Sequence, residues 1–70
     1  MDIILNGKVE VLKEELDVNE FLITLEKEKS INLSGAVVLI NDDVIKRENW
    51  KYTVIKNGDV VEVLSFVSGG

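Results

Sequence analysis

One stretch of this sequence has the periodicity of an amphipathic helix, and runs typical of β-strands lie on both sides of it. Apolar residues recur there at i, i+3, i+4 and i+7, which places them on one helical face: Val18, Phe21, Leu22 and Leu25. Asp17 is a suitable N-cap, and Glu20 three residues later completes a capping-box pattern. The fold must therefore cover this single apolar face with a sheet.

Two short β-rich runs precede the predicted helix, Ile3–Leu5 and Val9–Val11. Asn6-Gly7 between them is a strong hairpin signal, because both residues tolerate the positive φ angles of a type I′ turn. A phosphate-binding turn is the alternative, but no glycine-rich loop followed by a helix supports it. In the second run Val9 and Val11 alternate with Lys8 and Glu10, as on a half-buried strand.

The strands after the helix are marked by apolar runs and by turn residues. Ala36–Ile40 is continuously apolar, which predicts an interior strand covered on both faces. Asn41–Asp43 forms the next predicted turn and leads to a brief Val44–Ile45 strand. Lys56–Asp59 supplies another tight turn before the final strand, which runs from Val60 to Phe66.

The polar segment from Lys46 to Thr53 contains Trp50. We expect an irregular turn in which Trp50 packs down as a small satellite core. The alternative is a surface hot spot for a partner, because tryptophan is enriched in such sites.

This order of elements predicts an α+β fold, in which a mixed sheet of four to five strands packs on one main helix. A right-handed crossover through the helix would make the last strand parallel to the first, with both at the centre of the sheet. That arrangement is the β-grasp, or ubiquitin-like, architecture. We expect a β-grasp domain over residues 1–66 and a flexible C-terminal tail over residues 67–70.

Composition excludes several kinds of chemistry. The 70 residues include neither Cys nor His, so thiol nucleophiles, imidazole bases and soft-metal ligands are missing. A net charge of −5 argues against nucleic-acid binding and favours a partner with a basic surface. We therefore expect that this protein is not itself an enzyme. The enzyme alternative is that the adjacent acids Asp42 and Asp43 do acid-base or metal chemistry. With neither a signal sequence nor a membrane-length apolar run, we expect a cytoplasmic protein that is a monomer when free.

The sequence finishes with Val67-Ser68-Gly69-Gly70, directly after the predicted last strand. Paired glycines lack Cβ atoms and can lie in a channel too narrow for other side chains. Such a tail suits a terminal carboxylate that is delivered into another protein's active site. The alternative is a frayed end or an expression remnant.

Several segments together resemble the ThiS family of thiamine-biosynthesis sulfur carriers. The resemblance runs over the whole chain and rests on this ordered set: Leu5-Asn6-Gly7-Lys8, Val38–Asn41, Ile45, Arg47–Trp50, Asn57-Gly58-Asp59, Val61-Glu62-Val63 and Phe66–Gly70. The family often has proline where Lys46 stands and a third glycine where Ser68 stands. Because serine is small, the second departure leaves the tail able to pass a narrow channel.

The resemblance implies one functional group, the carboxylate of Gly70, carried on a tail of Val67, Ser68 and Gly69. An E1-like adenylating enzyme that uses ATP would activate this carboxylate. A sulfur donor, such as the persulfide of a cysteine desulfurase, would convert it to a thiocarboxylate that donates sulfur to thiazole synthase. The ATP, metal and persulfide belong to these partners, so the chain itself needs no cofactor.

Leu64 and Phe66 alternate on the predicted last strand and therefore share a face. Our hypothesis is that they form an exposed apolar patch that docks on the E1-like enzyme. The alternative is that both lie beneath the helix.

Two other functions fit the same fold. The small subunit of molybdopterin synthase also ends in Gly-Gly and carries sulfur, but it typically has a proline pair before its tail, and this chain has no proline. A ubiquitin-like modifier or interaction module is the second alternative, with a tail that forms isopeptide bonds or has no reaction.

Overall fold

A computed structural model describes residues 1–65 as five strands, one α-helix and one 3₁₀-helix. In chain order the elements are β1 (Asp2–Leu5), β2 (Lys8–Val11), α1 (Val18–Lys29), β3 (Val37–Ile40), β4 (Asp43–Ile45), η1 (Arg47–Tyr52) and β5 (Val60–Leu64). The predictions for Phe66 and for residues 67–70 lie outside the described residues.

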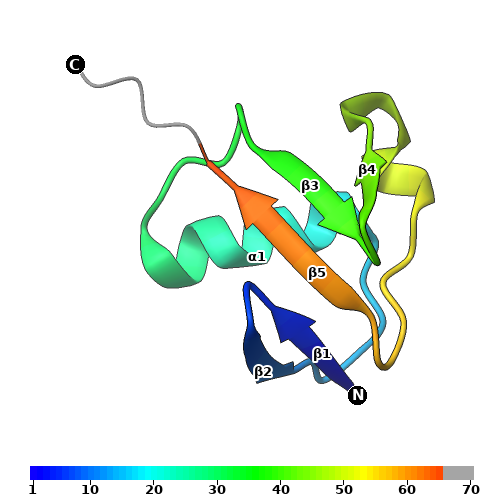
Figure 1. Cartoon of the computed structure of the whole chain (residues 1–70). Helices are drawn as coiled ribbons and strands as arrows, with labels where there is room; N and C mark the ends of the chain where they lie inside the picture. Colours follow the sequence, from blue (N-terminus) through cyan, green and yellow to red (C-terminus); the bar gives the residue numbers. More distant parts are fainter. Residues whose placement is uncertain (66–70) are drawn as a thin grey trace.

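The strands form one sheet in the order β2-β1-β5-β3-β4, with α1 crossing behind it (Figure 1). β1 and β5 pair in parallel at the centre, through Ile4 with Val60 and Leu5 with Val61. All other neighbouring strands are antiparallel. The predicted mixed sheet on one helix is confirmed, and so is the ubiquitin-like β-grasp architecture.

The turns follow the residues that tolerate left-handed backbone. Asn6 and Gly7, between β1 and β2, have φ angles of 49° and 84°, as a type I′ hairpin turn requires. Asn41 and Asp42 adopt φ angles of 51° and 71° between β3 and β4. The hairpin predicted from Asn6-Gly7 is confirmed, with register pairs from Asp2–Val11 to Leu5–Lys8.

The N-terminus of α1 is fixed by the predicted capping box. The backbone N–H of Glu20 donates to the Asp17 carboxylate at 2.7 Å, and the backbone N–H of Asp17 donates to the Glu20 carboxylate at 3.1 Å. Each carboxylate thus satisfies a donor that the first turn leaves unpaired. The buried residues of α1 are the four predicted from periodicity: Val18, Phe21, Leu22 and Leu25.

The hydrophobic core lies between α1 and the sheet face that α1 covers. Strand residues on this face alternate with less buried ones, and the core members contributed by strands are Ile3, Leu5, Val38, Ile40 and Val61. Ile55 and Leu33 complete the core from the loops. One helix covers only one face of the sheet, so among residues 1–65 the opposite face has no second layer.

Because α1 covers only one face of the sheet, the predictions for the second and third strands were wrong. Val9 and Val11 are 69% and 70% exposed, whereas Glu10 is partly covered. The register places Glu10 opposite buried Ile3, so it is the polar residues of β2 that share the covered face. β3 alternates between half-buried and buried residues and is not covered on both faces.

Trp50 lies in η1 and is buried, at 8% exposure. Its indole Nε1–H donates to the Ile45 carbonyl at 3.0 Å, and the Arg47 guanidinium lies 5.4 Å from the ring centroid. The side chain joins the main core instead of forming a satellite core. Because it is buried, Trp50 is not the exposed hot spot of the alternative interpretation.

Candidate functional site

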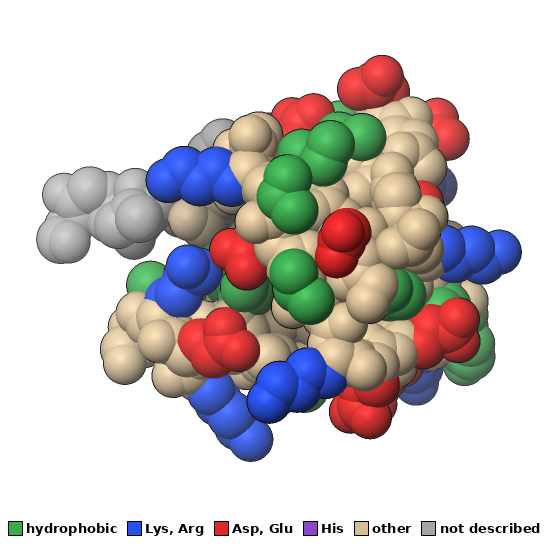
Figure 2. Space-filling view, turned by 90° about the horizontal axis from the view of Figure 1, so that it is seen from below, with side chains coloured by type: hydrophobic (Ala, Val, Ile, Leu, Met, Phe, Trp, Pro, Cys, Tyr) green, Lys and Arg blue, Asp and Glu red, His purple; other side chains and the backbone are tan. Residues whose placement is uncertain are grey.

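The sheet face that α1 does not cover is almost wholly apolar. Residues opposite one another across paired strands point to the same face, so the registers assign one continuous set of side chains to it. This set, which we call the open face, consists of Val9, Val11, Ile4, Val60, Leu64, Val37, Leu39 and Val44, with Asp2 and Glu62 as its polar members. From the side on which β2 lies, several hydrophobic side chains are exposed together (Figure 2).

Exposure distinguishes the open face from a second core. Val44 is 62% exposed, and Ile4 and Val60 are each 38% exposed, although all three lie on paired strands. Soluble monomers seldom expose large contiguous apolar surfaces unless those surfaces bind something. Both charged members of the open face are acidic. The face therefore fits a partner surface that is apolar with basic groups.

Leu64 is a member of the open face, 45% exposed and opposite Val37 of β3. The alternative that Leu64 lies beneath the helix is wrong. Phe66, predicted to act with it, lies outside the described residues. A partner-binding role for the two residues stays a prediction.

The other predicted site residues, Val67, Ser68, Gly69 and Gly70, also lie outside the described residues. The structure shows the strand that leads to them. β5 is the central strand, with β1 on one side and β3 on the other, and it ends at Leu64. Gly70 is six residues further along the chain. β5 therefore ends at one end of the open face, and it is paired on both sides within the sheet.

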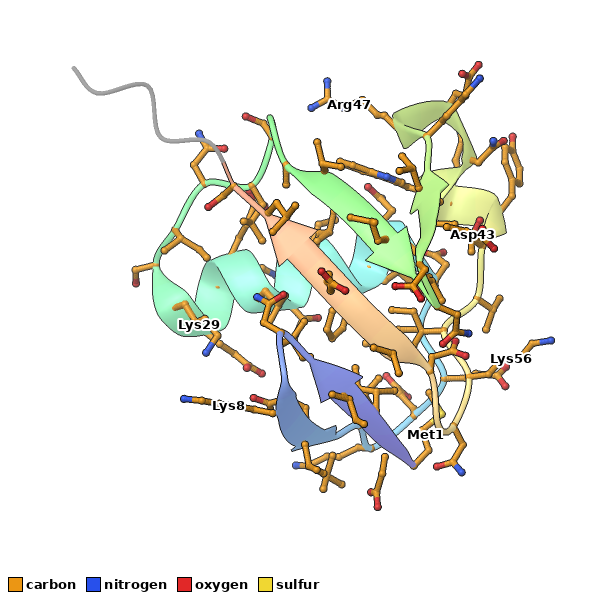
Figure 3. The ribbon with its side chains drawn as sticks, in the orientation of Figure 1. Met1, Lys8, Lys29, Asp43, Arg47 and Lys56 are labelled. Atoms are coloured by element: carbon orange, nitrogen blue, oxygen red, sulfur yellow. The ribbon has the colours of Figure 1, made fainter. Side chains whose placement is uncertain are left out.

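The described residues offer little for metal or acid-base chemistry. No group of three or more acidic side chains within residues 1–65 could hold a metal ion. Asp42 and Asp43 are both exposed, and Asp42 occupies the β3–β4 turn. Among the labelled basic side chains, Lys8 and Lys29 extend on the same side of the molecule, whereas Arg47 and Lys56 extend elsewhere, so the four do not form one cluster (Figure 3). Within residues 1–65 no helix is long and apolar enough to span a membrane.

A groove of about 490 Å³ lies between α1 and η1, on the other layer of the molecule. Its lining is partly apolar, with charged side chains of both signs: Asn19, Leu22, Ile23, Glu26, Leu33, Ser34, Arg47, Glu48, Trp50 and Lys51. The Glu26 carboxylate already accepts the Leu33 backbone N–H at 2.7 Å. This mixture of charges favours no single class of ligand.

The parallel pairing of β1 with β5, the single covering helix and the apolar open face define a small ubiquitin-like β-grasp protein. The sequence model of the ThiS family matches residues 3–70. The chain therefore belongs to the ThiS family, whose members are small sulfur carriers of thiamine biosynthesis. The family resemblance seen in the sequence is confirmed.

Solved structures support this assignment. The crystal structure of the thiamine biosynthesis protein ThiS from Geobacter metallireducens is 36% identical to this chain, covers 100% of both chains and superposes with a TM-score of 0.83. The solution NMR structure of a thiamine biosynthesis protein from the same organism is also 36% identical. It covers 100% of this chain and 88% of its own, with a TM-score of 0.79. No curated protein matches the chain.

The sequence interpretation found Leu64 but not the rest of the open face. The missing signal was the hairpin register. Once Asn6-Gly7 is placed as a two-residue turn, Leu5 pairs with Lys8 and Ile4 with Val9. Combined with the burial of Ile3 and Leu5, this register assigns Val9 and Val11 to the exposed side.

Proposed function

We propose that this chain carries sulfur on its C-terminal Gly70 as a thiocarboxylate destined for thiazole formation. The membership of residues 3–70 in the ThiS family supports this, since that match includes the Gly69-Gly70 end. The observation that carries the proposal is structural: the central strand β5 leads toward that end along the apolar open face. A partner that holds the open face thereby holds the base of the tail.

The chemistry assigns the chain the role of a substrate. A carboxylate is a poor electrophile, so an E1-like enzyme first joins Gly70 to AMP from ATP and releases pyrophosphate. The terminal sulfur of a donor persulfide, such as that of a cysteine desulfurase, then displaces AMP. A thiol that cleaves the resulting acyl disulfide leaves the thiocarboxylate on Gly70, and thiazole synthase accepts its sulfur. The folded body supplies binding energy that offsets the cost of ordering the tail.

The open face is the docking surface in this proposal. Its apolar residues extend across all five strands, so a partner would bury them together with Leu64. Asp2 and Glu62 would then face basic groups of the partner. The predicted part of Phe66 in this contact lies outside the described residues.

Intact mass after incubation with the adenylating enzyme, ATP and a sulfur donor tests the proposal. The expected product is the chain with one oxygen exchanged for sulfur, and it should lose that sulfur to added thiazole synthase. Deletion of Gly70 should abolish product while the thermal unfolding curve stays unchanged. Asp42→Ala is the matched control and should react like the wild type.

Other outcomes identify the rival functions. Adducts linked to lysine would identify a protein modifier. Transfer of sulfur only to the large subunit of molybdopterin synthase would identify the other carrier class. An unmodified chain in every reaction would leave a passive interaction module.

A further inference from the structure

The side chain of Asn6 reaches from the β1–β2 turn to β5, across 57 positions of sequence. The backbone N–H of Val63 donates to Asn6 Oδ1 at 2.9 Å, and Asn6 Nδ2 donates to the Val63 carbonyl at 3.4 Å. The backbone N–H of Asn6 also donates to the Val61 carbonyl at 2.9 Å. Asn6 thus contacts Val61 and Val63, two residues apart on the same edge of β5.

Strand geometry explains why these contacts matter. Backbone groups two residues apart on a strand point to the same side, so Val63 faces the β1 side as Val61 does. β1 ends at Leu5 and the chain turns away, so no backbone of β1 lies opposite Val63. The amide side chain of Asn6 takes that place and acts as one more peptide unit of β1.

Asn41 makes the equivalent contact at the opposite end of β5. The Val60 backbone N–H donates to Asn41 Oδ1 at 3.0 Å, and the Asn41 backbone N–H donates to the Val60 carbonyl at 2.8 Å. Asn41 Nδ2 donates to the Asp59 carboxylate at 3.1 Å. Both asparagines have left-handed backbone and exposed side chains. They differ in which end of β5 they hold: Asn41 holds its start, and Asn6 holds the end nearest Gly70.

We infer that Asn6 is a positioning residue for the reaction at Gly70, an inference that rests on the proposed function. Val63 is seven residues before Gly70, and Leu64 beside it is held by Val37 on the β3 side. With Asn6 present, β5 is fixed on the β1 side up to Val63 and on the β3 side up to Leu64. Without that side chain, the backbone N–H of Asn6 still holds the Val61 carbonyl but Val63 loses its partner on the β1 side, so the position from which the carboxylate is delivered is less defined.

Asn6→Gly removes the side chain and keeps the positive φ angle without strain, because glycine favours that conformation. Asn41→Gly is the matched control, with the same chemical change at the other end of the same strand. Two measurements separate them: amide hydrogen exchange of Val63 and Val60 in the free chain, and kcat and KM for adenylation by the E1-like enzyme, followed by pyrophosphate release.

For Asn6→Gly we expect faster exchange at Val63 and a kcat lower by about three- to tenfold, the effect of one lost hydrogen-bonded contact, with KM unchanged because the open face is intact. Asn41→Gly should speed exchange at Val60 and leave kcat unchanged. Asn6→Asp keeps the acceptor for the Val63 N–H and should recover part of kcat. This variant also keeps the inference testable if Asn6→Gly fails to fold.

Equal losses of kcat in Asn6→Gly and Asn41→Gly would overturn the positioning role, because the effect would then be general destabilisation. If Asn6→Gly exchanges faster at Val63 but keeps its kcat, the positioning role of Asn6 is overturned. The proposed function is not affected by that result. A wild-type chain that is never adenylated would refute the proposed function and the positioning role together.

Discussion

Asparagine side chains join segments that are far apart in this sequence. Besides Asn6 and Asn41, Asn57 accepts the Asp2 backbone N–H through Oδ1 at 2.7 Å. Asparagine suits these positions because it tolerates turn conformations and its amide has both a donor and an acceptor. The sequence predicted each of these turns from local signals. It could not predict the amide contacts, because their partners are set by the sheet order.

The indole N–H of Trp50 also makes a contact that composition does not reveal. The variant Trp50→Phe tests how much this hydrogen bond contributes to the free energy of unfolding. The variant keeps an aromatic ring in the core but leaves the Ile45 carbonyl without its donor. We expect the free energy of unfolding to fall by about 1–3 kcal/mol. Urea denaturation followed by far-UV circular dichroism measures it.

The matched control for Trp50→Phe is Tyr52→Phe in the same 3₁₀-helix. Tyr52 is 75% exposed, so its substitution should change stability by less than about 0.5 kcal/mol. Similar losses in both variants would show that η1 as a whole, and not the Trp50 bond, determines the effect.

At the scale of elements, α1 was predictable because its signals are local. The capping box of Asp17 and Glu20 and the apolar face all lie within a dozen residues. The strands were harder. Alternation in β2 and the apolar run of β3 identify strands, but they do not state which face is covered. The single helix covers only one face of the sheet. Apolar residues predicted to be interior, such as Val9 and Val11 of β2, therefore lie on the open face.

Partner binding should depend on this face and not on the helix layer. Leu64→Ser and Ile23→Ser form a matched pair, since the two side chains are 45% and 43% exposed and lie on opposite layers. Leu64→Ser should weaken affinity for the adenylating enzyme about tenfold or more, equivalent to about 1.4 kcal/mol, whereas Ile23→Ser should leave it unchanged.

Isothermal titration calorimetry with the adenylating enzyme measures both affinities. Because both side chains are partly exposed, we expect small and similar changes in stability, which urea denaturation checks. The reverse pattern, in which Ile23→Ser weakens binding, would move the docking surface to the groove between α1 and η1.

At the scale of the whole molecule, we expect the net charge of −5 to guide encounter with a basic partner. Glu62 lies within the open face, whereas Glu14 is an exposed residue of the β2–α1 connection. Raising salt from about 0.05 to 0.5 M should slow association with a basic partner about tenfold and change dissociation little.

Stopped-flow association rates at several salt concentrations test this expectation. Glu62→Gln should reduce the salt dependence of the association rate more than Glu14→Gln, because its charge lies within the contact. Rates that do not respond to salt would show that the charge of this chain does not guide the encounter.

The central place of β5 has a consequence for how the molecule is made. β1 and β3 have no contact through the sheet until β5 enters between them, yet β5 is the last of the five strands to leave the ribosome. Long-range parallel pairing forms late, after the local hairpin and helix. A nascent chain that stops before Val60 therefore has no completed sheet on which α1 can pack. Such unfinished chains would present no ordered open face to a binding partner.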